Sequence, residues 1–108
     1  MEQIDLMKLQ ENAGKAAELL KIMSHPSRLM VLCHLFKGEC PVSDLNQVVP
    51  LSQSALSQHL AGLRKAGLVD TRRESQIIYY RLKSHAVTAV LETLYKIYCE
   101  SNDEEKKR

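Results

Sequence analysis

Residues 51–69 read LSQSALSQHLAGLRKAGLV, the pattern of one helix with two dissimilar faces. Leucines at helical spacing form an apolar stripe: Leu56, Leu60 and Leu63. The other face carries short amides and hydroxyls: Gln53, Ser54, Ser57 and Gln58. Ser52 is placed to cap the first turn, and Gly67 stands where a helix C-terminus favours glycine. The polar face suits either hydrogen bonding in a DNA groove or simple exposure to solvent.

Length and composition limit the class of protein. The chain of 108 residues is expected to form one domain, and its 44% of hydrophobic residues excludes a disordered chain. No apolar run reaches membrane-spanning length. The acidic, amphipathic N-terminus does not resemble a secretion signal. We therefore expect a cytoplasmic protein with no membrane partner.

Positive charge is concentrated in one part of the chain. Residues 51–83 hold six basic and two acidic side chains, a net charge of +4, whereas residues 1–50 and 84–108 each sum to −1. Such a concentration is expected of a surface that binds a polyanion. Arg64 belongs to this basic segment, lies within the helix of residues 51–69 and is a candidate for DNA contact.

Two helices are predicted before the short segment that precedes Leu51. The first, from Leu6 to Met23, has a narrow apolar stripe rich in alanine. This stripe would pack either on the core of its own chain or also against a partner subunit. Ser24-His25-Pro26 ends it and begins the second helix, in which Leu29, Leu32, Cys33 and Phe36 share a face. This places Cys33 toward the interior or its margin.

A short helix opened by Pro41 and the turn Val49-Pro50-Leu51 lead into the helix of residues 51–69. Val42, Leu45 and Val49 are expected to face inward. A short helix, a tight turn and a second helix with a polar face make a helix-turn-helix.

The period then changes to two, which predicts a β-hairpin around Glu74-Ser75-Gln76 with Ile77, Tyr79 and Arg81 on its outer face. A basic hairpin after a helix-turn-helix is typical of a winged helix. Arg72 and Arg73 would then contact phosphates or a minor groove, although basic residues also protect a strand edge.

The last helix is capped by Ser84 and carries one apolar stripe: Val87, Val90, Leu91, Leu94 and Tyr98. Residues 1–99 form the predicted domain, and residues 100–108 are a polar tail expected to be disordered. Amphipathic helices at both ends suggest a dimer, which would present two recognition helices to two half-sites.

In three motifs the chain resembles the ArsR family of bacterial winged-helix repressors: KIMSHPSRLMVL (21–32), LSQSALSQHLAGLRKAGLV (51–69) and IIYYRL (77–82). The resemblance implies a mainly α, five-helix dimer with a small β-hairpin wing, which binds a palindromic operator and releases it when an inducer is sensed. By the same match, Ser54, Ser57, Gln58 and His59 lie on or beside the DNA-facing helix. The position of His59 between Leu56 and Leu63 favours packing over base reading.

Metal-sensing sites of the family are incomplete in this sequence. The segment where one site has a cysteine pair offers only Cys40, with Ser43 at the position of a second sulfur. The last helix offers His85, Glu92 and Glu100 without paired histidines, and His25 and His34 are isolated. We predict no metal site and no cofactor; a metal-responsive repressor remains the alternative through Cys40.

Cys33 and Cys99 resemble the sensor cysteines of the BigR, SqrR and HlyU subgroup, in which reactive sulfur species or oxidants bridge two thiols and lift repression. By this resemblance they form a redox sensor. Cys40 departs from that pattern: it stands at the start of the short helix, where the helix N-terminus lowers a thiol pKa. Three pairings are possible among the three cysteines; we favour Cys33–Cys99 and treat Cys40 as accessory. Buried structural thiols are the alternative.

Alternative functions follow from the same sequence. A HlyU-like anti-repressor would share the DNA-binding surface. A thiol oxidoreductase is disfavoured by the absence of C-x-x-C, and no enzyme activity is expected.

Overall fold

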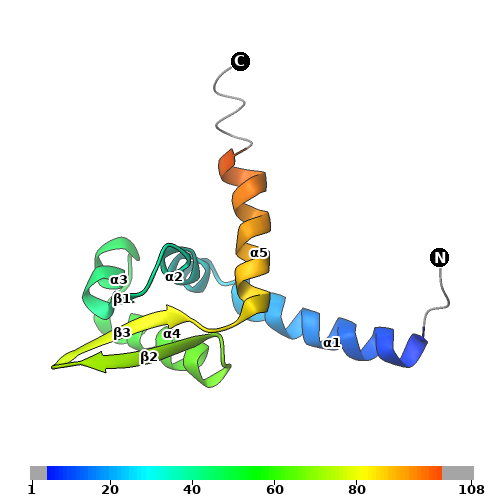
Figure 1. The fold of residues 1–108 in the computed structure, drawn as a ribbon, viewed down its shortest axis with the longest axis horizontal. Coiled ribbons are helices and arrows are strands. Elements are labelled where there is room, and N and C mark those ends of the chain that lie inside the picture. Colours follow the sequence, from blue (N-terminus) through cyan, green and yellow to red (C-terminus); the bar gives the residue numbers. More distant parts are fainter. Residues whose placement is uncertain (1–4, 101–108) are drawn as a thin grey trace, which may run out of the picture.

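The computed structural model describes residues 5–100 (Figure 1). Its elements are α1 (Leu6–Met23), α2 (Pro26–Phe36), β1 (Cys40–Pro41), α3 (Val42–Val48), α4 (Gln53–Lys65), β2 (Val69–Glu74), β3 (Ile77–Leu82), α5 (His85–Tyr95) and a π-helical turn, η1 (Lys96–Glu100). Five α-helices and a small wing within this range confirm the predicted winged helix-turn-helix fold. None of the helices described is both long and apolar enough to cross a membrane.

Polar caps define where the helices begin. The Ser52 hydroxyl accepts a hydrogen bond from the Ala55 amide (3.2 Å) at the start of α4, and the Ser84 hydroxyl accepts one from the Val87 amide (3.2 Å) at the start of α5. Both caps were predicted. Helix α4 is shorter than the stretch 51–69, because the chain leaves the helix before Gly67, which has a positive φ of 80°.

The core lies among α2, α3, α4 and the start of α5. The inward stripe of α4 is confirmed, since Leu56, Leu60 and Leu63 are each exposed by 1% or less. Leu45 from α3 and Val87 from α5 are also fully buried against this cluster. The apolar side of α4 is therefore fixed in the core, and this leaves its polar side at the surface.

The wing is an antiparallel hairpin with one additional strand. Strands β2 and β3 pair from Val69 opposite Leu82 to Glu74 opposite Ile77, as the alternation predicted, and Ser75 at the tip has φ 60°. The short strand β1 was not predicted; it pairs with β3 through Cys40 opposite Tyr80, giving the order β1-β3-β2. Through β1 the sheet is tied to the segment that joins α2 to α3.

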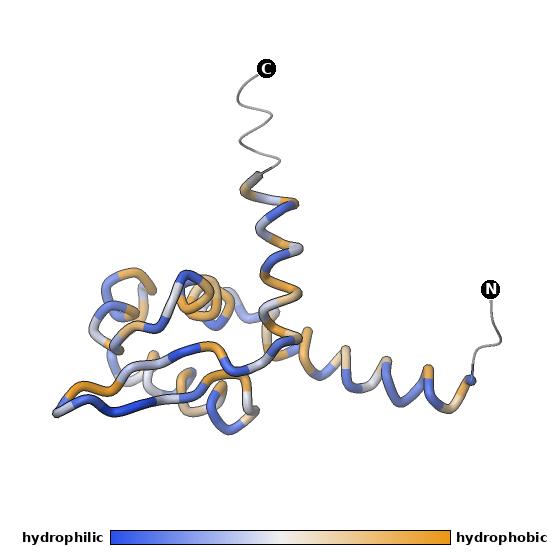
Figure 2. The backbone as a smooth tube through the Cα atoms, viewed as in Figure 1, coloured by the Kyte–Doolittle hydropathy of each residue, from blue (hydrophilic) through white to orange (hydrophobic). Residues whose placement is uncertain are grey.

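Helices α1 and α5 project from the core as two arms (Figure 1). Within α1 only the last turn is well buried, with Met23 exposed by 3%, whereas Leu6 and Leu20 are exposed by 75% and 54%. Apolar bands continue along both arms in Figure 2. The radius of gyration is 16.5 Å, compared with about 13 Å for a compact domain of this length. The apolar stripe of α1 therefore lies mostly outside the core of its own chain.

The predicted boundary before the tail falls inside η1, which includes Glu100. The rest of the predicted tail, residues 101–108, and residues 1–4 lie outside the described residues.

Candidate DNA-binding surface and thiol groove

The polar face of α4 is open to solvent. All four side chains assigned to DNA contact from this face are exposed: Gln53, Ser54, Ser57 and Gln58. Ser52, the fifth predicted contact in this region, is exposed but also caps the helix, and its hydroxyl lies 3.4 Å from that of Ser54. The face presents several hydrogen-bonding groups of the kind that read base edges and phosphates.

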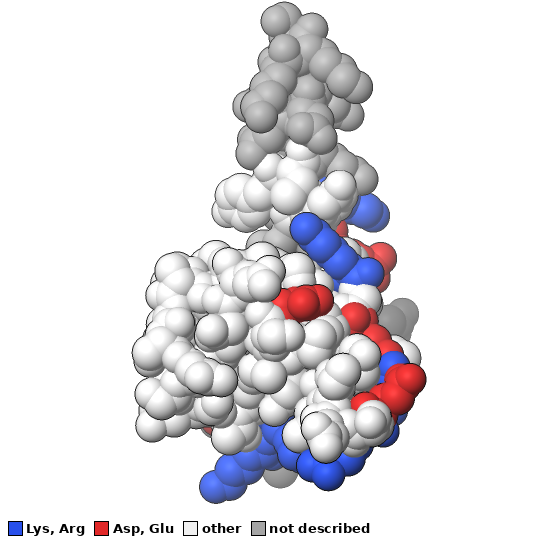
Figure 3. All heavy atoms as spheres, turned by 90° about the vertical axis from the view of Figure 1, so that its left-hand side faces the viewer, with Lys and Arg blue, Asp and Glu red and all other residues white. Residues whose placement is uncertain are grey.

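Basic side chains gather at the lower edge of the molecule in Figure 3, on the side where Figure 1 places α4 and β2. Arg64 in the last turn of α4 and Arg73 on β2 are exposed, and neither forms an ion pair within the described residues. Arg81 is different, because its guanidinium lies 3.2 Å from the carboxylate of Asp70. Arg64 and Arg73 are therefore the arginines of this surface best placed for phosphate contact.

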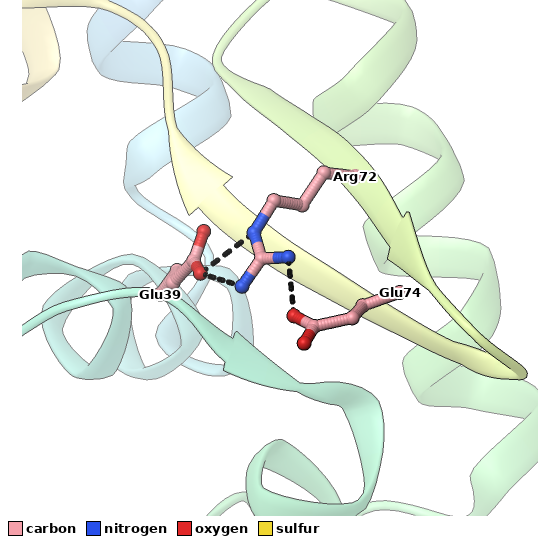
Figure 4. Close-up of polar contacts among 3 residues, drawn as sticks. All are labelled: Glu39, Arg72 and Glu74. Carbon is pink, nitrogen blue, oxygen red and sulfur yellow. Dashed lines mark hydrogen bonds and ion pairs between the residues drawn. The ribbon is translucent and has the colours of Figure 1, made fainter.

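Arg72 occupies a different environment from its neighbour Arg73, although the sequence suggested the same contact for both. Successive strand residues face opposite sides of a sheet, and Arg72 lies between two carboxylates (Figure 4). Its Nε donates to Glu39 (2.8 Å), its Nη1 donates to Glu74 (2.7 Å), and its guanidinium lies 4.5 Å from the centre of the Tyr79 ring. The Arg72 hydrogen bond lowers the pKa of Glu39. Arg72 thus joins the wing to the end of the α2–β1 connection.

His59 is half-buried and faces α2. Its Nδ1 accepts a hydrogen bond from Nε of Arg28 (3.3 Å), and its ring centre lies 4.6 Å from that of His25. This geometry favours the packing role over base reading. The prediction that His25 is isolated is wrong, because the fold brings it from the α1–α2 turn to α4. Arg28 and His25, to which the sequence assigned no contact with the helix of residues 51–69, therefore both contact His59 on α4.

We expect the free energy of unfolding to fall as the pH drops below about 6.5, in part because of His59. Burial, followed by the nearby His25 and Arg28, lowers the pKa of His59 from 6.5. The unfolded chain therefore takes up a proton at this site at a higher pH than the folded chain. The contribution of His59 is complete above pH 6.5 and is lost as the pH falls toward the lowered pKa.

Urea unfolding at pH 7.5 and 5.5 measures this dependence. His59→Gln keeps a hydrogen-bond acceptor for Arg28 and should reduce the acid loss, whereas His85→Gln, at the exposed start of α5, should retain it. An unchanged acid loss in His59→Gln would exclude His59 as its source.

Cys33 of α2 and Cys99 of η1 line one groove between α2 and α5, of about 860 Å³. The other lining residues are mostly apolar: Leu29, Phe36, Lys37, Leu91, Leu94, Tyr95 and Tyr98. Both cysteines are exposed residues. Cys33 thus lies at the margin of the core, as expected, and the fold brings together two cysteines that are far apart in sequence.

The groove opposes ionisation of Cys33. Burial of its sulfur among apolar neighbours and the nearby Cys99 raise the pKa of the thiol, while Lys37 opposes this shift. Part of Cys33 nevertheless reaches solvent. The thiol is accessible to a reagent, and Lys37 is the group that favours its thiolate.

The placement of Cys40 corrects the sequence prediction. This cysteine lies in β1 rather than at an accessible helix N-terminus, and it is only 7% exposed. Burial and the nearby Asp44 raise its pKa, opposite to the predicted direction. Pairing of β1 with β3 moves Cys40 into the core, so the reason for an accessory sensor role is lost.

Within residues 5–100 no group of three or more His, Cys, Asp or Glu side chains is arranged to hold a metal ion.

Comparison with known proteins agrees with this architecture. The family described as "Bacterial regulatory protein, arsR family" matches residues 25–71. The transcriptional activator HlyU of Vibrio cholerae is 46% identical over 92% of this chain and 92% of its own length. The biofilm growth-associated repressor of Agrobacterium fabrum is 43% identical over 90% of this chain and 83% of its own length. The crystal structure of HlyU from Vibrio vulnificus has a TM-score of 0.84 and 48% identity, covering 89% of this chain and 100% of that one. The chain therefore belongs to the ArsR family: it is a DNA-binding transcriptional regulator and not an enzyme.

Proposed function

We propose that this regulator is a homodimeric repressor with a Cys33–Cys99 dithiol switch, which releases a palindromic operator when reactive sulfur species or oxidants bridge the two thiols. The observation that carries the proposal is the groove that Cys33 and Cys99 line together, both as exposed residues. Cys33 comes from α2 and Cys99 from the turn after α5, so a bridge would join two helices of one subunit.

The chemistry needs one sulfur donor and two thiols. A Cys33 thiolate attacks the terminal sulfur of a hydropersulfide, R–S–SH; the donor's S–S bond breaks, RS⁻ leaves and takes a proton from water, and Cys33 carries S–SH. The Cys99 thiolate then attacks Sγ of Cys33 and displaces HS⁻, which leaves a disulfide. With hydrogen peroxide, Cys33 becomes a sulfenic acid as hydroxide leaves, and Cys99 closes the disulfide with loss of water.

Contacts within the chain suggest how a bridge would affect DNA binding. Cys33 shares α2 with Arg28, which donates a hydrogen bond to His59 on α4. A bridge that pulls α2 toward η1 therefore acts on a helix bonded to the recognition helix. Since α5 belongs to a projecting arm, the same bridge would also change the position of that arm relative to α4. An allosteric coupling of 1–3 kcal/mol, about 5- to 150-fold in affinity, is typical.

The test measures affinity for a duplex that the reduced protein has selected from a random library. Treatment with a persulfide donor should weaken binding by the wild type about 5- to 150-fold, and mass spectrometry should find Cys33 linked to Cys99. After the same treatment, Cys33→Ser and Cys99→Ser should keep their affinity for the duplex. Cys40→Ser, the matched control, should release DNA like the wild type. Release by either sensor variant would contradict the dithiol switch, and release by zinc or arsenite alone under reducing conditions would favour a metal sensor.

The sign of regulation needs a separate measurement, because one relative is called an activator and another a repressor. A repressor should block transcription from its own operator with purified RNA polymerase alone. A HlyU-like anti-repressor would instead raise transcription only when a competing DNA-binding protein is present. Activation without a competitor would contradict both.

The homodimer proposal is supported by the exposed apolar stripe of α1. Leu20→Glu should shift the protein toward monomers and weaken operator binding at least tenfold, since a charge would be placed where two subunits meet. Lys15→Glu, on the polar side of the same helix, is the control and should leave the dimer intact. Sedimentation velocity measures the oligomeric state; a dimer unaffected by Leu20→Glu would place the interface elsewhere.

A further inference from the structure

The groove between α2 and α5 has a composition that a simple pair of reactive cysteines does not need. Six of its nine lining residues are aliphatic or aromatic, and Lys37 is the one charged side chain among them. Its volume of about 860 Å³ lies within the usual range for small-molecule sites, about 300–1,000 Å³. The two thiols therefore line a space large enough for an organic molecule.

We propose that this groove is a binding site for small organic hydropersulfides with an apolar carbon group, which it selects over hydrophilic persulfides before sulfur reaches Cys33. This inference rests on the proposed dithiol function and adds the class of inducer. The carbon group lies against Leu91, Leu94 and Tyr95, and the S–SH end meets the thiols. A peptide persulfide such as that of glutathione carries several charges, which an apolar lining disfavours.

Lys37 contributes to the chemical step. It ends α2, one turn after Cys33, and lines the groove with it. Sulfur transfer from R–S–SH begins with a Cys33 thiolate and ends with RS⁻ as the leaving group, which then takes a proton from water. Both are anions, and a neighbouring ammonium stabilises both. Lys37 also opposes the rise in the Cys33 pKa that burial causes. Lys37 therefore accelerates the step whatever the carbon group is, whereas the apolar lining discriminates between carbon groups.

The experiment compares benzyl hydropersulfide with glutathione hydropersulfide, each released from a donor at the same rate. The full chain is reduced before exposure, and mass spectrometry follows the conversion of the Cys33 thiol to its persulfide or to the disulfide with Cys99. The benzyl compound should react about tenfold faster. A factor of ten corresponds to roughly 55 Å² of apolar surface at about 25 cal/mol per Å², less than a benzyl group can bury.

Three variants separate the roles of the lining. Leu94→Gln places an amide in the groove and should bring the ratio of the two rates toward one. Lys37→Met should slow both persulfides and leave their ratio unchanged. Lys15→Met, on α1 and outside the groove, should match the wild type in both rates. Circular dichroism of each variant confirms that it is folded, and Lys37→Met supplies a readout even if Leu94→Gln unfolds.

The outcomes distinguish this inference from the function on which it rests. Equal rates for the two persulfides, or a preference that Leu94→Gln leaves intact, would overturn selection by the groove while the dithiol switch stands. Reaction of neither compound with Cys33 would overturn both. A rate that rises when the protein is diluted would show that a second copy of the chain occupies the groove, and this too would overturn the proposal.

Discussion

Leu60→Ala is expected to lower the free energy of unfolding by about 2–5 kcal/mol, the range for removing a buried leucine from a packed core. Leu60 is 1% exposed and lies between Leu56 and Leu63 on the inward stripe of α4. The cost has two parts, the lost burial of the side chain and the cavity left behind. Because small domains are stabilised by only about 5–15 kcal/mol, this loss is a large share of the total.

The same substitution should weaken DNA binding, since the polar face of α4 is held in place by its apolar face. Urea unfolding followed by circular dichroism measures the stability, at one fixed protein concentration because a dimer's stability depends on it. Val48→Ala is the control: Val48 is 44% exposed, so its loss should stay within about 0.5 kcal/mol. Equal losses for the two variants would mean that α4 is not anchored through its leucine stripe.

The joint replacement of Arg64 and Arg73 by glutamine should make DNA binding much less sensitive to salt. Each phosphate contact contributes about 0.9 to the slope of log affinity against log salt concentration. Two arginines in each subunit of a dimer would reduce the slope by about 3–4. Fluorescence anisotropy with the selected duplex, at several salt concentrations, measures the slope. An unchanged slope would show that these arginines do not face DNA.

Glu39→Gln should change the slope in the opposite direction. Glu39 accepts hydrogen bonds from two guanidinium nitrogens of Arg72. Loss of the Glu39 carboxylate leaves Arg72 paired with Glu74 alone, so Arg72 becomes more available for phosphate contact, as Arg73 is. We expect a slope steeper by up to about 2 per dimer. If binding instead weakens with no change in slope, the Glu39–Arg72 contact positions the wing and does not compete with phosphate.

Much of the fold could be predicted because its signals are local. The leucine stripe of α4, the caps Ser52 and Ser84 and the alternation in the hairpin each lie within a few residues. The strand β1 could not be found in this way. It has two residues, one of them proline, and it exists only because β3 lies beside it. The burial of Cys40 follows from that pairing and was missed for the same reason.

Of the candidate site, the sequence predicted the exposed face of α4 but not the different environments of Arg72 and Arg73. The polar face of α4 is exposed as its spacing indicated, because a helix whose other face is buried has little freedom in orientation. Arg72 and Arg73 are adjacent and chemically alike, and nothing in the sequence separates them. Their difference comes from Glu39, which the fold brings across from a position 33 residues earlier. His25 and His59 likewise meet only in the folded chain.

By itself, the sequence of residues 51–69 determined a helix with a leucine side and an amide–hydroxyl side, since periodicity and capping act over one or two turns. Only the tertiary structure decided which charges and sulfurs are free to act. It neutralised Arg72 and left Arg73 exposed, buried Cys40, and placed Cys33 and Cys99 in one apolar groove. The physical reason is that ion pairing, burial and thiol proximity depend on residues distant in sequence, which become neighbours only when the helices pack.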